Sequence, residues 1–247
     1  MTLLVKVAIP YGGTCEFRAR NLKHVTAWID AHHGYDISVG TSDRTPFSPA
    51  QARNNAARTA GEWDVLLHWD GDTIAHPDAI REAAELAATS NKLVFAANAH
   101  TYCDELSTQR FIDTGLWFPA PTDWPDTRTQ YRAAGSSKQF DPKSIYRDPS
   151  GGILAVSREL WDATGGYCDS LGGDDSYEDL VFFAQAQIFA AGITRVAGMQ
   201  LHLWHPPAAR VRGANHHHYH QLVRIMQRPN AKKCARDYLA QLGHTVP

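Results

Sequence analysis

The sequence lacks any hydrophobic run of the roughly 18 residues that a membrane-spanning helix needs. Its first ten residues also lack the basic leader of a secretory signal peptide, so we interpret them as a first strand. Cysteine is sparse, and the four cysteines show no paired spacing, which disfavours a disulfide framework or a zinc site. We therefore expect a cytoplasmic protein with reduced thiols and no membrane span.

Several nucleotide and metal motifs are also missing. No G-x-G-x-x-G follows the first strand, and no G-x-x-x-x-G-K-[ST] occurs anywhere, which disfavours dinucleotide dehydrogenases and P-loop enzymes. H-E-x-x-H is absent, so a helical zinc-protease site is not expected. The two glycines of Pro10-Tyr11-Gly12-Gly13-Thr14 match neither the dinucleotide-binding spacing nor the P-loop spacing.

Charge is unevenly distributed along the 247 residues, although the net charge is only −2. Residues 206–247 carry seven Lys or Arg and one acid, Asp237, while the remainder of the chain is acidic. This basic tail suits either an anionic ligand or a solvated terminal helix, and the sequence favours neither.

Hydrophobic patterning alternates between strands and helices. Short apolar runs predict strands at 5–9, 37–40, 64–69, 93–97, 151–156 and 193–199. Amphipathic spacing and start signals predict helices at 18–32, 48–60, 77–88, 157–163, 176–191 and 217–227. The order predicts an α/β fold with a Rossmann-like, mostly parallel central sheet flanked by helices. Residues 99–150, rich in proline and aromatics, are interpreted as a long functional loop region or a small extra core.

The most informative motif is Asp70-Gly71-Asp72, directly after the apolar run at 64–69. Open α/β sheets bind ligands at the carboxyl ends of their strands. Two carboxylates there suit a hard divalent cation with oxygen ligands, and such a cation would stabilise a leaving diphosphate. An Asp-Gly turn without a ligand is the simpler alternative.

Two later segments carry further candidates. Glu178 and Asp179 open a helix, where Ser176 would complete a capping box; either carboxylate could also act as a general base, and Asp175 is an alternative base. His202 and His205 follow a strand and precede a Pro-Pro turn, so one of them could contact a metal ion of the Mn²⁺ type.

The candidate nucleotide pocket lies where the first strands end. Pro10, Tyr11 and Asp43 lie at the ends of the first two predicted strands, and Arg53 lies on the next helix. We expect these residues around the base and diphosphate of a nucleotide. Arg53 is the expected diphosphate contact because a guanidinium matches phosphate geometry.

Taken in order, these segments resemble a GT-A glycosyltransferase of the family 2 type, with affinities to galactosyltransferases and chondroitin-polymerase-like enzymes. The matching segments cover most of the chain: Ile9-Pro10-Tyr11, Arg18-x-Arg20-Asn21-Leu22, Phe47-Ser48-x-Ala50-x-Ala52-Arg53-Asn54, Trp69-Asp70-Gly71-Asp72, Ser150-Gly151-Gly152, Gly165-Gly166-Tyr167, Tyr177-Glu178-Asp179-Leu180 and His202-Leu203-Trp204-His205-Pro206.

The resemblance implies a single domain over 1–247, with a nucleotide-sugar-binding half (1–98), an acceptor-side half carrying an insertion (99–205) and a basic helical tail (206–247). It implies a nucleotide-diphosphate sugar donor, most often UDP-linked, with Mn²⁺ or Mg²⁺, and inversion at the anomeric carbon. In this interpretation Asp72 and a histidine, His205 rather than His202, bind the metal. Asp70 contacts the donor ribose or a metal-bound water, Asp179 is the base, and Glu178 holds an acceptor hydroxyl.

Two other function classes stay open at this point. A sugar nucleotidyltransferase would also use acidic metal ligands on an α/β sheet, although Gly12-Gly13 lacks the basic phosphate loop that such enzymes carry. A non-catalytic carbohydrate- or nucleic-acid-binding module would leave the Asp70, Asp72, Asp179 and His205 set unexplained. The acceptor could be a saccharide, a protein side chain or a modified nucleic-acid base.

Overall fold

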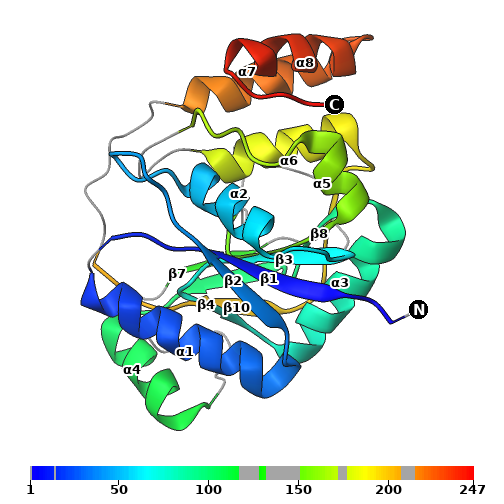
Figure 1. The fold of residues 1–247 in the computed structure, drawn as a ribbon. Coiled ribbons are helices and arrows are strands. Elements are labelled where there is room, and N and C mark those ends of the chain that lie inside the picture. Colours follow the sequence, from blue (N-terminus) through cyan, green and yellow to red (C-terminus); the bar gives the residue numbers. More distant parts are fainter. Residues whose placement is uncertain (1, 14, 117–127, 132–150, 172–176, 207–214) are drawn as a thin grey trace.

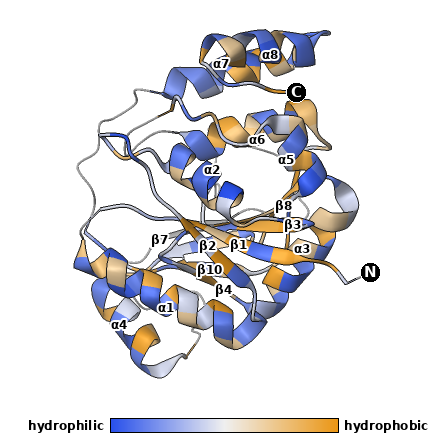
Figure 2. Ribbon diagram, in the orientation of Figure 1, coloured by the Kyte–Doolittle hydropathy of each residue, from blue (hydrophilic) through white to orange (hydrophobic). Residues whose placement is uncertain are grey.

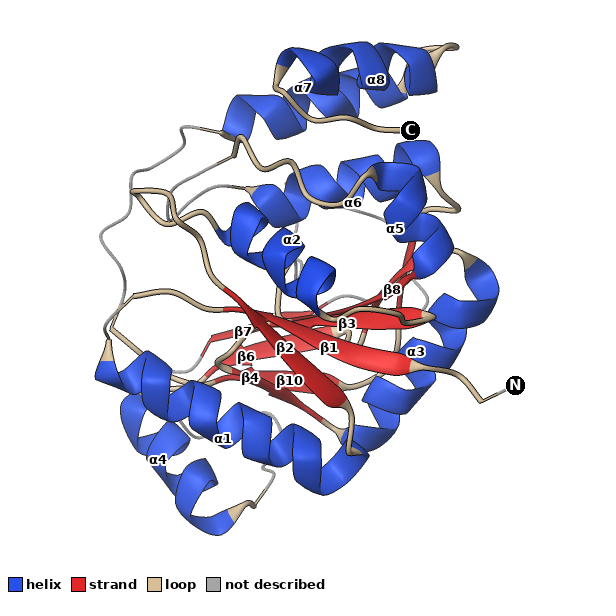
Figure 3. Cartoon of the chain, in the orientation of Figure 1, coloured by secondary structure: helices blue, strands red, loops and turns tan. Residues whose placement is uncertain are grey.

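The structure is a computed structural model that describes residues 2–13, 15–116, 128–131, 151–171, 177–206 and 215–247 (Figure 1). Within these residues no helix is long and apolar enough to cross a membrane. The described chain forms a layered α/β fold around a central sheet, as the alternating pattern predicts (Figure 3).

The central sheet has six strands in the order β2-β1-β3-β8-β5-β9. Their bounds are β1 Val5–Pro10, β2 Asp36–Gly40, β3 Val65–Trp69, β5 Leu93–Phe95, β8 Ile153–Ser157 and β9 Ile193–Arg195. Three of the five pairings are parallel, and only β8 runs against its neighbours β3 and β5. The chain enters β8 at the carboxyl end of β3, where Ile153 pairs with Trp69, so β8 must run in the opposite direction.

Helices cover both faces of this sheet. On one face lie α1 (Glu16–His33) and α3 (Pro77–Ser90), whose apolar sides pack on Val7, Ile9 and Leu67. On the other lie α2 (Pro49–Thr59), α5 (Arg158–Thr164) and α6 (Glu178–Phe189), packed on alternate residues of the same strands. Figure 2 shows the result: hydrophobic strands lie at the centre, and the outward sides of α1 and α2 are hydrophilic.

Start signals in the sequence place α2 correctly. The hydroxyl of Ser48 accepts the backbone N–H of Gln51 at 3.3 Å, which caps the helix as the sequence predicts. Helix α6 begins at Glu178 with Tyr177 at its N-cap position, whereas Ser176, the predicted cap, and Asp175, the alternative base, lie outside the described residues. Tyr177 has a positive φ of 53°, a conformation that costs energy for a bulky residue.

A second, smaller sheet lies beside the first, with the order β4-β10-β6-β7. It comprises β4 Thr73–Ala75, β10 Met199–His202, β6 Ala99–Tyr102 and β7 Arg128–Tyr131, and helix α4 (Glu105–Thr114) follows β6. Two sequence interpretations are corrected here. The predicted strand at 193–199 is two strands, β9 and β10, in different sheets. The predicted long loop from residue 99 contains β6, α4 and β7, whereas 117–127 and 132–150 lie outside the described residues.

The C-terminal segment forms a third layer. Helices α7 (His216–Met226) and α8 (Ala231–Gln241) pack on α6 through Val181, Leu222 and Leu239, on the side away from the sheet (Figure 1). The sequence predicts α7 but not α8.

Candidate active site

A cavity of about 310 Å³ opens at the carboxyl ends of β1 and β3. This volume is within the range of small-ligand sites. Eight of the ten predicted site residues line it: Pro10, Tyr11, Arg53, Asp70, Asp72, Glu178, His202 and His205. Asp43 is exposed and is not among the lining residues, so its nucleotide contact stays a prediction.

One side of the cavity holds a carboxylate between two imidazoles. The Nε2 atom of His205 lies 3.2 Å from Asp72 Oδ2, and His202 Nε2 lies 3.6 Å from Asp72 Oδ1. Burial alone would raise the pKa of Asp72, but the two imidazoles outweigh it and hold that pKa well below its usual range. The hydrogen bond to Asp72 in turn raises the pKa of His205.

This cluster fits a divalent metal ion by its donor set. One ligand atom from each of Asp72, His202 and His205 lies within 4.8 Å of the other two. One carboxylate and two imidazoles suit a Mn²⁺-type ion better than Mg²⁺, which prefers oxygen ligands alone. The sequence favours His205 over His202, and the structure brings both to Asp72.

The His202–His205 segment is fixed by α1 and α4. The buried Asn21 amide donates to the backbone oxygens of Leu203 (3.3 Å) and Trp204 (3.0 Å). The Trp204 N–H donates to the Thr108 hydroxyl at 2.7 Å. The Leu203 N–H also donates to the Asp72 backbone oxygen at 2.6 Å, so both sides of the cluster are held by main-chain bonds.

Asp70 faces a different partner from Asp72. Its Oδ1 accepts from Arg53 Nη2 at 2.6 Å, and its Oδ2 accepts the Gly152 N–H at 2.9 Å. Arg53 Nε also lies 3.6 Å from Glu178 Oε1. Asp70 therefore bonds directly to α2 and to the residue before β8, and Arg53 links it to Glu178 of α6. The predicted metal contact of Asp70 stays a prediction.

Arg53 is a buried cation rather than a surface helix residue, since it is only 5% exposed. Burial alone would lower its pKa, but the Asp70 carboxylate, with Tyr167 and Glu178, raises it above the ordinary value. Arg53 is thus charged at any physiological pH and links the motif after β3 to the start of α6. Its predicted diphosphate contact is not tested by this geometry, although the guanidinium does line the cavity.

Asp179 lies near Asp70 and is not among the residues that line the cavity. Asp70 Oδ2 and Asp179 Oδ2 lie 3.6 and 3.7 Å from the point where a Cβ on Gly151 would stand, so the two carboxylates approach each other across this glycine. Burial, followed by the charge of Glu178, raises the pKa of Asp179 to about 8. A carboxyl with this pKa exchanges its proton near neutral pH, as a general base requires.

The glycine pair before β8 gives the site its shape. Gly152 has a φ of +98°, and a Cβ there would overlap the side chain of Gln200. The Gln200 amide donates to the Gly151 oxygen at 2.8 Å, and its oxygen accepts the Ile153 N–H at 3.2 Å. Gln200 therefore fixes the backbone that donates to Asp70.

Sequence reasoning assigned no individual role to several of these residues. Tyr102 lines the cavity and stacks near His202, with ring centroids 5.0 Å apart. It lies in the stretch interpreted as a loop, and Gln200 lies just beyond the predicted strand at 193–199, within β10. Phe47 and Arg18 also line the cavity; both belong to segments that carry the resemblance.

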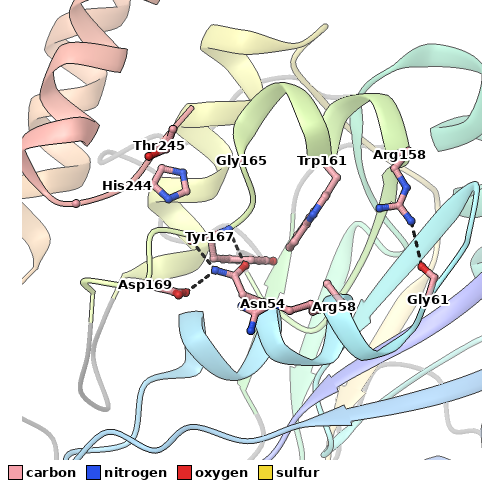
Figure 4. A pocket seen from close by; sticks show the side chains of 12 residues that line it. Asn54, Arg58, Gly61, Arg158, Trp161, Gly165, Tyr167, Asp169, His244 and Thr245 are labelled. Atoms are coloured by element: carbon pink, nitrogen blue, oxygen red, sulfur yellow. Dashed lines mark hydrogen bonds between the residues drawn. The ribbon is translucent and has the colours of Figure 1, made fainter. Parts of the chain in front are cut away.

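A second cavity, of about 540 Å³, lies between α2, α5 and the C-terminal segment (Figure 4). Its polar groups bond mainly to one another. The Asn54 amide group donates to the Tyr167 oxygen at 2.8 Å and accepts the Tyr167 N–H at 3.0 Å. Arg158 donates to the Gly61 oxygen at 3.2 Å and lies over the Trp63 ring. This cavity lacks the convergent carboxylates and imidazoles of the first, so we place the candidate active site in the smaller one.

No protein-family model and no curated protein matches the sequence. Solved structures do match the fold. A Drosophila β1,4-galactosyltransferase 7 variant in complex with manganese, UDP-Gal and xylobiose has a TM-score of 0.50 at 16% identity, over 84% of this chain and 76% of that chain.

Two further matches have the same character. S. aureus TarS has a TM-score of 0.53 at 12% identity, over 96% of this chain and 42% of that one. GalNAc-T7 with UDP, GalNAc and Mn²⁺ has a TM-score of 0.50 at 14% identity, over 98% of this chain and 55% of that one. At these identities the likeness concerns the fold, and it confirms the expected architecture: the chain has the GT-A fold of these glycosyltransferases.

Proposed function

We propose that this chain is a metal-dependent glycosyltransferase that moves a sugar from a nucleotide-diphosphate donor to an acceptor hydroxyl with inversion. One observation carries the proposal. The Asp72–His202–His205 cluster and Glu178 line one cavity, and Asp179, a carboxyl of raised pKa, is the next residue along α6. A displacement at a sugar carbon needs these two kinds of group on opposite sides of the reacting atom.

The donor side is formed by Asp72, His202 and His205, which would hold the metal ion. When bound, the ion supplies positive charge that stabilises the leaving diphosphate. Pro10 and Tyr11, at the end of β1, line the cavity, and in this proposal they contact the nucleotide. The galactosyltransferase 7 and GalNAc-T7 structures contain UDP-Gal and UDP respectively, and on this basis we favour a UDP-sugar.

The acceptor side is formed by Asp179 and Glu178. The Asp179 carboxylate takes the proton of the attacking hydroxyl as its oxygen bonds to the anomeric carbon. The bond from that carbon to the diphosphate breaks on the opposite face, and the diphosphate leaves with the electron pair. Single displacement of this kind inverts the anomeric carbon. Glu178 is placed to hold an acceptor hydroxyl, which we expect to belong to a saccharide.

Arg53 has a positioning role in this proposal. It contacts Asp70 and Glu178, one on the donor side and one on the acceptor side, and it is buried between them. A fixed cation there holds both carboxylates in one orientation and offsets their mutual repulsion.

The test is donor hydrolysis and transfer with a panel of nucleotide sugars in the presence of Mn²⁺. Wild-type protein should release a nucleoside diphosphate from one donor of the panel, and Asp72→Asn should abolish both this activity and Mn²⁺-dependent donor binding. Asp162→Asn, which removes an exposed carboxylate on α5, is the matched control and should behave as wild type.

Three results would contradict the proposal. Pyrophosphate release from a nucleoside triphosphate and a sugar phosphate would identify a nucleotidyltransferase instead. Saccharide binding without any turnover of the donor panel would identify a binding module. Unchanged Mn²⁺-dependent nucleotide binding in Asp72→Asn, measured by calorimetry, would refute the metal assignment.

A further inference from the structure

The run His216-His217-His218-Tyr219-His220 opens helix α7, and none of its members is among the residues that line the cavity described above. Two residues of this run make contacts within the fold. Tyr219 is buried in the core between α6, α7 and α8, and His218 Nδ1 lies 2.6 Å from the Tyr238 hydroxyl. His216 and His220 are exposed and lie one helical turn apart on one face of the helix.

The two exposed imidazoles are joined by a hydrogen bond between their Nε2 atoms, whose donor depends on the tautomers. Their Nε2 atoms lie 2.8 Å apart, and their ring planes are inclined at 80° with centroids 4.1 Å apart. Two histidines four residues apart on one face of a helix can both present a ring nitrogen to one metal ion, and the neutral imidazole is the commonest metal ligand in proteins.

We propose that His216 and His220 form a binding site for a divalent transition metal of the Ni²⁺ or Cu²⁺ type, separate from the Asp72–His202–His205 cluster. The site is formed by α7 alone, so it does not depend on the proposed transferase activity.

The nitrogen separation distinguishes between metals. With metal–nitrogen distances of about 2.0–2.1 Å, a right-angled pair of ligands has its nitrogens about 2.9 Å apart, while a tetrahedral pair has them about 3.4 Å apart. The observed 2.8 Å, a hydrogen-bond contact between the two rings, is closer to the right-angled separation than to the tetrahedral one. Square-planar and octahedral ions, Cu²⁺ and Ni²⁺, prefer this angle, and both rank high in affinity for nitrogen ligands.

The surrounding charge points the same way. Arg224 lies one turn further along α7 and adds a positive charge beside His220. A positive neighbour disfavours hard cations held by charge alone, such as Mg²⁺, Ca²⁺ or Mn²⁺. Lone-pair donation is then the dominant attraction, and it favours Cu²⁺ and Ni²⁺.

The site also contacts the helix that carries the candidate base. The ring of His216 packs edge-on against that of Tyr177, with centroids 4.9 Å apart, and Tyr177 directly precedes Glu178 and Asp179. A bound ion would fix the His216 ring and so strengthen the contact between α7 and the start of α6.

The experiment uses the full chain without an affinity tag and with Asp72→Asn in the background, so that the cavity cluster is disabled. Ni²⁺ is titrated by calorimetry, and Cu²⁺ is followed by electron paramagnetic resonance for signals of nitrogen ligands. We expect one equivalent of metal to bind, and we expect either His216→Ala or His220→Ala to abolish the site. The matched control is His217→Ala, because the His217 ring faces His218 rather than this pair; it should retain binding.

A melting curve without metal checks that each variant is folded, and all three positions are on the outer part of α7. Added Ni²⁺ should raise the melting temperature of the background protein and of His217→Ala, but not of the other two variants. Absence of binding in the background protein would overturn the proposal. Binding that survives His220→Ala, or that is lost equally in His217→Ala, would also overturn it and indicate an adventitious ion on the histidine run.

Discussion

Replacing Asp179 by asparagine is expected to stabilise the fold while destroying the proposed activity. The folded protein raises the pKa of Asp179 from its ordinary value of 3.8 to about 8, through burial and the charge of Glu178. Between these two pH values the unfolded chain releases a proton that the folded chain retains. The contribution of Asp179 to the stability of the wild-type protein is therefore fully present below pH 4 and is lost progressively as the pH rises toward 8. Asparagine resembles the protonated carboxyl and does not titrate, so the variant escapes this loss.

The magnitude follows from the linkage relation. One titrating group changes the free energy of unfolding by at most about 1.4 kcal/mol per pH unit. Over the three units from pH 4 to pH 7 the limit is about 4 kcal/mol. Because Asp179 keeps partial contact with solvent, we expect roughly half of this, about 2 kcal/mol in favour of the variant at pH 7. The carbonyl of asparagine can still accept the Leu180 N–H, which Asp179 Oδ1 accepts at 2.7 Å, so no hydrogen bond is lost.

The assay is urea unfolding of the metal-free protein at half-unit steps from pH 4.5 to pH 8.5. The quantity of interest is the difference in unfolding free energy between Asp179→Asn and wild type. It should widen with pH and then level off, whereas Asp162→Asn should show no such widening. In the same preparations the turnover of Asp179→Asn should fall by roughly 10²–10⁴-fold, the usual contribution of a general base. A difference that stays constant across the pH range would refute the burial of this carboxyl, and unchanged turnover would refute its role as base.

Three further changes test the frame of the site. Gly152→Ala should destabilise the fold by roughly 2–4 kcal/mol, because it combines a strained φ of +98° with overlap on Gln200. The control is Gly61→Ala, which has a φ of +72° and open space and should cost only about 1 kcal/mol. Equal losses of stability in the two variants, measured by chemical unfolding, would contradict the overlap. Asn21→Ala leaves two backbone oxygens without their side-chain donor, so it should lower the free energy of unfolding by about 1–3 kcal/mol and weaken Mn²⁺ binding measured by calorimetry. An unchanged Mn²⁺ affinity would show that the Asn21 hydrogen bonds do not position the histidines. His205→Ala should weaken Mn²⁺ binding by at least tenfold, and an unaltered titration would remove His205 from the ligand set.

Local patterns predicted the parts of the fold that depend on local physics. The apolar run at 64–69 forms β3, and the Ser48 capping signal starts α2 where expected. The direction of β8 was not predictable in this way, because the hydrophobic pattern of a buried strand is the same in a parallel and in an antiparallel pairing. The second sheet was missed for a similar reason: its strands have three or four residues, too few for alternation to show.

The site shows the same limit at the level of single residues. In the sequence Asp70 and Asp72 form one motif, and both were expected near the metal. In the structure their partners separate them, because Asp70 bonds to Arg53 and Asp72 faces His205. Each partner comes from a distant element, α2 for one and the segment after β10 for the other. The role of a carboxylate in this cavity is therefore set by which buried cation or imidazole the fold brings to it, and spacing along one turn does not contain that information.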